Sequence, residues 1–156
     1  MGTRFVFDFE KCTECRRCMT SCSVSKTGVV RMADSRIDIL RHWPELPDIR
    51  VCRFDDCDGH PCIASCPVEA ISEAGGIVAI DREACTGCEA CVDACPFHAI
   101  TMNGGTAMKC DFCGGDPECV KACVTAAIAK GRPVGHPRHG SAVPGPTSAI
   151  RGEGGA

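Results

Sequence analysis

The chain has 156 residues, of which sixteen are cysteine, and its formal net charge is −3 at pH 7. Six Phe, one Trp and no Tyr leave few large side chains to fill a core, so such a scaffold usually needs cross-links from disulfides or metals. The acidic balance argues against nucleic acid as a partner, and no apolar stretch reaches the length of a membrane span.

The N-terminal residues predict a short strand and carry no export signal. Residues 5–7 (Phe-Val-Phe) favour a strand, while Asp8 and Glu10 interrupt any apolar signal region. The pair Arg16-Arg17 lies between two cysteines and is therefore not interpreted as a twin-arginine signal. We expect a reducing, cytoplasmic location, where dense cysteine indicates metal binding more often than disulfides.

The cysteines fall into four groups of four, and every group ends in Cys-x3-Cys. In chain order the groups are Cys12-x2-Cys15-x2-Cys18-x3-Cys22, Cys52-x4-Cys57-x4-Cys62-x3-Cys66, Cys85-x2-Cys88-x2-Cys91-x3-Cys95 and Cys110-x2-Cys113-x5-Cys119-x3-Cys123. The last three endings also repeat in sequence, because segments 62–71, 91–100 and 119–128 are nearly superimposable. This repeat predicts one small structural unit used several times.

Short elements are predicted around these groups. Residues 37–40, 77–80 and 106–108 favour strands, with Gly75-Gly76 and Gly104-Gly105 as the turns before the last two. The Cys-x3-Cys stretches suit one or two helical turns. The predicted fold class is therefore α+β, with short helices and short strands.

Two other segments stand out. The loop from Arg41 to Pro47 carries the only Trp, Trp43. Its ring would either anchor a partner or cover a metal centre from water, and we prefer the second interpretation. Residues 131–156 are rich in Gly and Pro, a composition that cannot bury enough apolar surface to order itself. We expect this extended tail to be partner-bound or disordered.

The third group identifies the chemistry. In a Cys-x2-Cys-x2-Cys run a tight loop presents three sulfurs to one iron–sulfur cubane, and the fourth cysteine, often followed by Pro, is directed at a second cluster. Cys85 to Cys95, followed by Pro96, matches at every position. A structural zinc site instead pairs two separated knuckles. Zinc stays open as an alternative at the fourth group, between its two cysteine pairs.

Residues 5–130 resemble the four-cluster ferredoxin-type subunits of multi-subunit oxidoreductases. Such subunits serve molybdenum and tungsten enzymes, hydrogenases and carbon monoxide dehydrogenase, and the small size is most similar to the small subunit of tungsten aldehyde oxidoreductases. The resemblance implies two nested dicluster ferredoxin-like modules. The outer module would comprise residues 1–50 and 106–130, the inner module residues 51–105, and residues 131–156 would form the tail.

The resemblance also implies that the two cysteine groups of each module exchange their fourth cysteines, which gives four 4Fe–4S clusters in all. Carried over by position, the implied ligands are set A (Cys12, Cys15, Cys18 and Cys123), set B (Cys110, Cys113, Cys119 and Cys22), set C (Cys52, Cys57, Cys62 and Cys95) and set D (Cys85, Cys88, Cys91 and Cys66). This chain departs from the family pattern in lacking Pro after Cys22 and Cys123 and in its Cys52-x4-Cys57 spacing.

The implied function is an electron relay without a substrate site of its own. Electrons would pass between a catalytic subunit, with a tungsten enzyme as the best match, and a second redox partner such as a flavin subunit or a ferredoxin. The alternatives are a free-standing polyferredoxin, the small subunit of a hydrogenase, carbon monoxide dehydrogenase or formate dehydrogenase, and a structural zinc protein. No catalytic triad, phosphate-binding loop or dinucleotide fingerprint accompanies the cysteines.

Charged residues beside the cysteines have two interpretations each. Three aspartates inside the second group would lower the reduction potential of a cluster there, or lie in a solvated loop: Asp55, Asp56 and Asp58. The pair Arg16-Arg17 would raise the potential of the first cluster or grip a partner carboxylate, or form a plain exposed turn. His60 and His98 would serve as ligands only if a cysteine failed to bind.

Overall fold

The computed structural model describes residues 5–131. Its strands are β1 (Phe5–Phe7), β2 (Asp38–Leu40), β3 (Asp48–Arg50), β4 (Ile71–Ala74), β5 (Ile77–Ile80), β6 (Ile100–Asn103), β7 (Thr106–Lys109) and β8 (Ile128–Lys130). Its helices are α1 (Arg17–Thr27), α2 (Pro61–Ala64), α3 (Ala90–Ala94) and α4 (Glu118–Ala122). Single 3-10 turns lie at η1 (Phe9–Lys11), η2 (Met32–Asp34), η3 (Phe54–Asp56) and η4 (Phe112–Gly115).

The strands pair two by two, always antiparallel. Three pairs are hairpins of consecutive strands, β2 with β3, β4 with β5 and β6 with β7. The fourth pair joins the two ends of the described chain, since Phe5 of β1 lies opposite Lys130 of β8. Short helices mixed with short antiparallel strands confirm the predicted α+β class.

The predicted elements are found, although several more strands were missed. The strand at 77–80 and both Gly-Gly turns are found where predicted, and the strand at 37–40 begins one residue later, at Asp38. Four strands were missed: β3, and the strands β4, β6 and β8, which begin at the Ile that ends a repeat segment, namely Ile71, Ile100 and Ile128. Each is too short to show a period of its own, and it forms because an antiparallel partner supplies its hydrogen bonds.

The first helix is longer than the one or two turns predicted. It runs eleven residues and ends where Gly28 adopts a left-handed φ of 74°. Its buried Ser23 donates to the carbonyl of Val29 at 2.6 Å and accepts from the N–H of Arg31 at 2.9 Å. These side-chain bonds secure the segment that follows α1, which local sequence patterns do not reveal.

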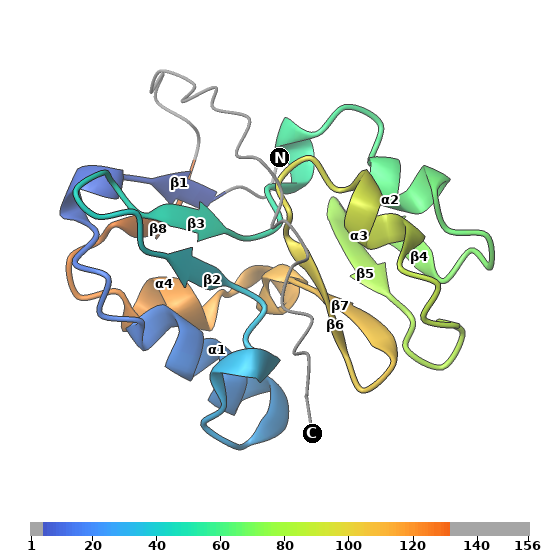
Figure 1. Ribbon diagram of the computed structural model, residues 1–156, viewed down its shortest axis with the longest axis horizontal. Coiled ribbons are helices and arrows are strands. Elements are labelled where there is room, and N and C mark those ends of the chain that lie inside the picture. Colours follow the sequence, from blue (N-terminus) through green and yellow to red (C-terminus); the bar gives the residue numbers. More distant parts are fainter. Residues whose placement is uncertain (1–4, 132–156) are drawn as a thin grey trace, which may run out of the picture.

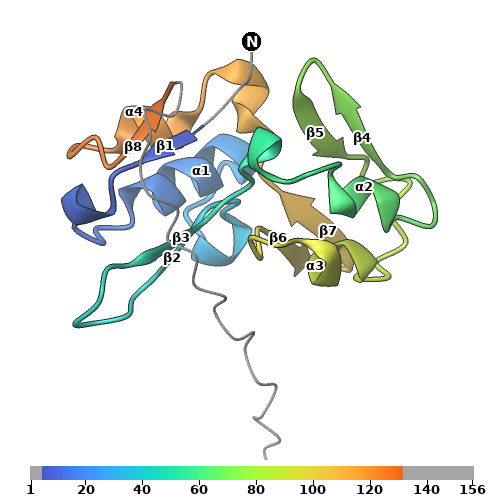
Figure 2. The same cartoon turned by 90° about the horizontal axis from the view of Figure 1, so that it is seen from above.

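The elements gather in two halves (Figures 1 and 2). One half contains α1, α4, β1, β8 and the β2–β3 hairpin, and the other contains α2, α3 and the β4–β5 hairpin, with β6–β7 beside it. Each half has its own apolar core. The first core is built on three Phe rings, with Phe112 at 4.7 Å from Phe5 and 5.6 Å from Phe54 between ring centroids.

Cysteines are a large part of both cores. Cys18, Cys22, Cys110 and Cys119 belong to the first core, and Cys62 and Cys91 to the second. The first core also takes in Val51 and Phe54. No helix within residues 5–131 combines the length and apolar character needed to cross a bilayer. The predicted tail, residues 131–156, lies outside the described residues apart from its first position.

Candidate metal centres

All sixteen cysteines lie in the described part of the chain, and all are free of disulfides. Their sulfurs gather into groups that mix distant parts of the sequence. Set A is one such group. Burial raises the pKa of the Cys18 thiol to about 12, and negative charge on Cys12, Cys123 and Cys15 acts in the same direction. Cys123 therefore lies with the first cysteine group, about a hundred residues away in sequence.

Set B shows the reciprocal arrangement. Burial raises the pKa of Cys119 to about 12, and the largest charge effects in the same direction come from Cys22 and Cys113. Burial also raises the pKa of the Cys110 thiol, with contributions from Cys119, Cys52 and Cys22. Cys22 thus lies among the cysteines of the fourth group.

Sets C and D assemble in the same way, with Cys52 of set C packed against the first core. Burial, followed by charge on Cys52, Cys62 and Cys95, raises the pKa of Cys57. The pKa of Cys91 is likewise raised by burial and by charge on Cys85, Cys66 and Cys88. The structure therefore brings together the members of all four sets that the resemblance implies.

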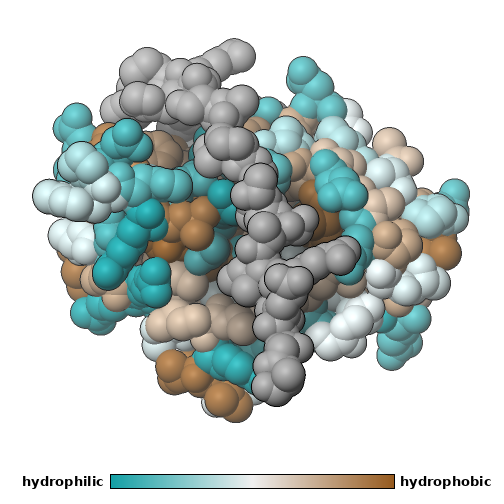
Figure 3. Space-filling model, in the orientation of Figure 1, coloured by the Kyte–Doolittle hydropathy of each residue, from teal (hydrophilic) through white to brown (hydrophobic). Residues whose placement is uncertain are grey.

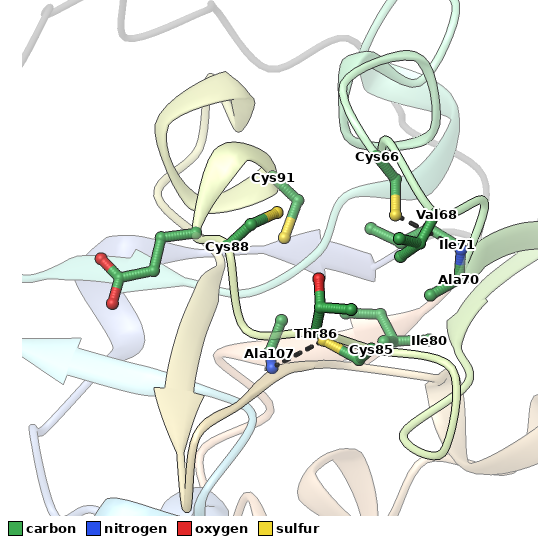
Figure 4. A pocket seen from close by; sticks show the side chains of 11 residues that line it. Cys66, Val68, Ala70, Ile71, Ile80, Cys85, Thr86, Cys88, Cys91 and Ala107 are labelled. Carbon is green, nitrogen blue, oxygen red and sulfur yellow. Dashed lines mark hydrogen bonds between the residues drawn. The ribbon is translucent and has the colours of Figure 1, made fainter.

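Set D surrounds a small apolar pocket. Figure 4 shows the side chains of Cys66, Cys85, Cys88 and Cys91 around this pocket, together with Val68 and Ile71. The sulfur of Cys66 accepts a hydrogen bond from the N–H of Ala70 at 3.3 Å, and that of Cys85 accepts one from Ala107 at 3.5 Å. Thiolates need such donors, because each carries negative charge away from water.

The repeat segments explain how these donors arise. The third residue after the last cysteine of each repeat has a left-handed φ: 52° at Glu69, 48° at His98 and 54° at Ala126. This turn directs the next N–H back at the sulfur, as in the bonds from Ala70 to Cys66 and from Ala99 to Cys95, at 3.3 and 3.4 Å. The repeated sequence thus encodes a repeated donor.

Cys123 has the same environment with more donors. Burial by itself would raise its pKa, but hydrogen bonds from the backbone of Ile128 and Ala127 and from Thr125 lower it below the usual value. Cys22 lacks this repeat and instead accepts a hydrogen bond from the N–H of Arg36 at 3.3 Å. A loop distant from the cysteine motif therefore supplies the donor in the first group.

The third cysteine group depends on a glycine. Gly87, between Cys85 and Cys88, has a φ of 73°, and a Cβ there would lie 2.2 Å from the carbonyl oxygen of Gly105. The ligand loop thus rests directly on the β6–β7 turn. Only Gly combines the left-handed conformation with this close approach.

The five residues between Cys113 and Cys119, a wider spacing than in the third group, are accommodated by a tight turn of the chain. Phe112, Cys113 and Gly114 have left-handed φ values of 53°, 50° and 67°, so the chain coils tightly between Cys110 and Cys119. Asp111 accepts a hydrogen bond from the N–H of Cys113 at 3.1 Å and stabilises this coil. The extra residues form a loop while Cys113 stays beside Cys119.

The preferred interpretation of Trp43 is wrong. Trp43 is 88% exposed on the loop between β2 and β3, so its ring does not cover a metal centre. Arg41, two residues before it, forms an ion pair with Glu14 of the first cysteine loop at 2.9 Å. The loop is therefore held beside set A while its Trp faces solvent.

The other flanking residues are mostly exposed. Asp56, Asp58, Arg16 and Arg17 are exposed, as is His98. His60 is partly buried, and its Nδ1 lies 3.6 Å from the sulfur of Cys57. Lys109, a buried cation beside Cys110, has no signal in the sequence, because nothing in strand β7 marks its last side chain as buried.

The four sets fit polynuclear clusters. In a 4Fe–4S cluster each of four thiolates binds a different iron atom, so the sulfurs surround the cluster. Set D has this arrangement, because its four thiols surround an apolar pocket and two of the sulfurs accept hydrogen bonds from backbone N–H groups.

Comparison with known proteins agrees with this geometry. The model of the 4Fe-4S dicluster domain matches residues 42–132, more than half of the chain, and that of a 4Fe-4S binding domain matches residues 9–25. The chain belongs to the 4Fe-4S dicluster domain family. The protein therefore contains 4Fe–4S clusters, and the number of its cysteines, sixteen, fits four of them.

Individual relatives of this dicluster protein cover most of its length. The polyferredoxin-like subunit of aliphatic sulfonate oxidoreductase from Pyrococcus furiosus is 36% identical over 118 residues, which are 73% of this chain and 67% of that protein. The thiosulfate reductase electron transfer subunit PhsB of Salmonella typhi is 34% identical over 142 residues, 80% of this chain and 73% of PhsB. A subunit of tetrathionate reductase from Salmonella typhimurium is 34% identical over 136 residues, 78% of this chain and 54% of that protein.

Proposed function

We propose that this protein is an iron–sulfur electron-transfer subunit of an oxidoreductase complex. Sets A, B, C and D each hold one 4Fe–4S cluster, with the fourth cysteines exchanged within two ferredoxin-like modules. The observation that carries the proposal is that cysteines from different groups lie together. Cys123 lies with Cys12 and Cys18, and Cys22 lies with Cys119.

The sets follow one another through the molecule. Cys18 of set A lies close enough to Cys119 of set B for its charge to raise the pKa of the Cys119 thiol, after burial and the nearer cysteines. The charge of Cys52 in set C likewise raises the pKa of the Cys110 thiol in set B. Cys62 of set C and Cys91 of set D belong to one apolar core. These contacts support the order A, B, C, D.

The two ends of this order reach the surface. Cys15 of set A and Cys88 of set D are exposed, whereas one or more cysteines in every set are buried. When bound, a 4Fe–4S cluster accepts and donates one electron at a time. The protein's own groups hold the thiolates in place, exclude water from the buried sulfurs and donate N–H groups to them. Each exposed cysteine marks a face where a redox partner can approach.

Exposed apolar side chains just after α1 and on the loop beside set A suit a partner subunit. Val29, Val30 and Met32 are exposed, and Figure 3 shows hydrophobic surface at the lower edge, over the segment that follows α1 in Figure 1. Trp43 is exposed on the loop held to the first cysteine group. Exposed aromatic and apolar side chains of this kind are common at protein interfaces.

Relatives support a catalytic oxidoreductase subunit as one partner. Those named above belong to aliphatic sulfonate oxidoreductase, thiosulfate reductase and tetrathionate reductase. For this chain we propose a cytoplasmic complex with a tungsten or molybdenum enzyme, on the small-subunit resemblance to tungsten aldehyde oxidoreductases. The second partner would be a flavin subunit or a ferredoxin.

Native mass spectrometry after anaerobic purification tests the relay subunit. We expect a complex with a larger subunit, whereas a lone chain would favour the alternative of a free-standing polyferredoxin. Metal analysis of the same sample for iron, acid-labile sulfide, zinc, tungsten, molybdenum and nickel identifies the centres. A preparation with zinc and without sulfide would contradict the proposal.

A further inference from the structure

Lys109 is a buried cation at the end of β7. The residue is 4% exposed, and its ammonium donates hydrogen bonds to the carbonyl oxygen of Val78 in β5 and to that of Cys110, the latter at 3.1 Å. The same nitrogen lies 4.9 Å from the centroid of the Phe54 ring. Carbonyl dipoles and an aromatic face therefore surround the charge.

These contacts do not neutralise the lysine. Among the described residues, Lys109 takes part in no ion pair, although the exposed Lys121 pairs with two carboxylates. A buried charge without a partner of opposite sign is costly, and proteins usually keep one only where another charge compensates it. The compensating charge is therefore to be sought in something the protein binds.

The position of Lys109 identifies that charge. Its ammonium faces the ring of Phe54, which lies in the loop between Cys52 and Cys57 of set C. It also bonds to the carbonyl of Cys110, a member of set B whose sulfur lies near Cys52 of set C. An oxidised 4Fe–4S cluster with four thiolates carries a net charge of about −2. Lys109 thus lies where sets B and C meet.

The aspartates of the second cysteine group oppose this effect only weakly. Asp56 and Asp58 are exposed, so water and salt screen their charges. Lys109 is buried among Phe54, Val78 and Cys110, where screening is much weaker. The buried cation therefore affects the reduction potential of a nearby cluster more strongly than the exposed anions do.

We propose that Lys109 is a fixed counter-charge for the cluster of set C and raises its reduction potential, so that this cluster accepts an electron more readily than its exposed aspartates would allow. The inference rests on the proposed function, because it requires a cluster at set C. Lys109 is buried and acts only through its charge.

Three variants of the intact, anaerobically purified protein test this role. Lys109→Met removes the charge and keeps the apolar stem, and Lys109→Arg keeps the charge. Lys130→Met is a matched control, because Lys130 also donates to a carbonyl, that of Gly115, and lies 5.9 Å from the Phe112 ring, but is exposed. Redox titration followed by electron paramagnetic resonance measures the potentials, and the signal altered in Cys57→Ser marks set C.

We expect Lys109→Met to shift the set C signal to a more negative potential, with a smaller shift at set B and none at sets A and D. Lys109→Arg should restore most of the change, and Lys130→Met should leave all potentials as in the wild type. Unchanged potentials in Lys109→Met, or an equal shift of all clusters, would overturn the inference.

Loss of clusters in the variants is also informative. If Lys109→Met fails to retain four clusters while Lys109→Arg retains them, a positive charge is needed at this position and the inference is supported. If both fail alike, the shape of lysine is what matters and the inference is overturned. A wild-type protein without iron and sulfide would instead remove the proposed function itself.

Discussion

Lys26 of α1 forms an ion pair with Asp111 at 2.8 Å, which links the first cysteine group to the loop of the fourth. Arg36 reaches the same carboxylate at 2.7 Å, and the two cationic side chains are largely buried. These cations lower the pKa of Asp111, although burial alone would raise it. Together with the bond from Ser21 to the Glu118 carbonyl at 3.3 Å, they hold α1 against the fourth group.

Asp111→Asn should therefore destabilise the protein. The substitution leaves two largely buried cations without their anion, at a cost of about 1–3 kcal/mol, which corresponds to a fall of roughly 3–10 °C in the melting temperature. Thermal unfolding under anaerobic conditions measures this fall in the melting temperature. Asp116→Asn is the control, because Asp116 is 77% exposed in its pair with Lys121 and should contribute little. Equal melting of both variants would contradict this account.

Removing Cys123 tests the exchanged ligand sets. Cys123→Ala should damage the cluster at Cys12, Cys15 and Cys18, by loss of one iron or of the whole cluster. The cluster at Cys110 should keep four thiolates through Cys22. A crystal structure of the variant with iron-specific anomalous density measures occupancy at each position. Depletion beside Cys110 instead of Cys12 would show that each cysteine group is an independent local site.

Cys95→Ala is the corresponding change in the other half. Because Cys95 lies with Cys57 and Cys62, its removal should deplete the cluster of set C and leave that of set D with four thiolates through Cys66. The same anomalous density gives the result. Intact density at set C would contradict the assignment in this half.

Gly87→Ala should disrupt the third cysteine group. A left-handed φ costs a residue with a Cβ about 1–2 kcal/mol, and here the Cβ would also strike the Gly105 carbonyl at 2.2 Å. Gly76→Ala is the control, since Gly76 has a φ of 78° and nothing within 4 Å of its Cβ position. We expect Gly76→Ala to retain four clusters and Gly87→Ala to lose iron. Equal iron content, measured by elemental analysis, would show that the loop moves aside.

Trp43→Ala should leave the isolated protein unchanged. Because its side chain is 88% exposed, truncation should alter stability by less than about 0.5 kcal/mol and should not speed the loss of clusters in air. Thermal melting and the decay of visible absorbance measure the two effects. Faster bleaching than in the wild type would restore the idea that the ring protects a cluster.

Removal of iron should unfold the protein. The two apolar cores are small and contain many of the cysteines, and the strands form only two-stranded sheets, which are marginal alone. Anaerobic chelation should abolish most of the far-ultraviolet circular dichroism. An apoprotein with native dichroism and a sharp melting transition would contradict this prediction.

The sequence by itself determined the local chemistry. The spacing of four cysteine groups, the Gly-Gly turns and the strand at 77–80 are properties of short segments, and the structure places them as predicted. The repeat also identified a unit whose geometry recurs, down to the left-handed residue that directs an N–H at a sulfur. Such features follow from backbone sterics and ligand spacing within about ten residues.

Only the tertiary structure decided what depends on distant parts of the chain. The pairing of β1 with β8, the exposure of Trp43 and the burial of Lys109 have no local signature. Each results from packing between distant segments, because whether a side chain meets water, a carbonyl or another cysteine depends on residues far away in sequence. The same long-range packing brings Cys22 beside Cys119 and Cys123 beside Cys18.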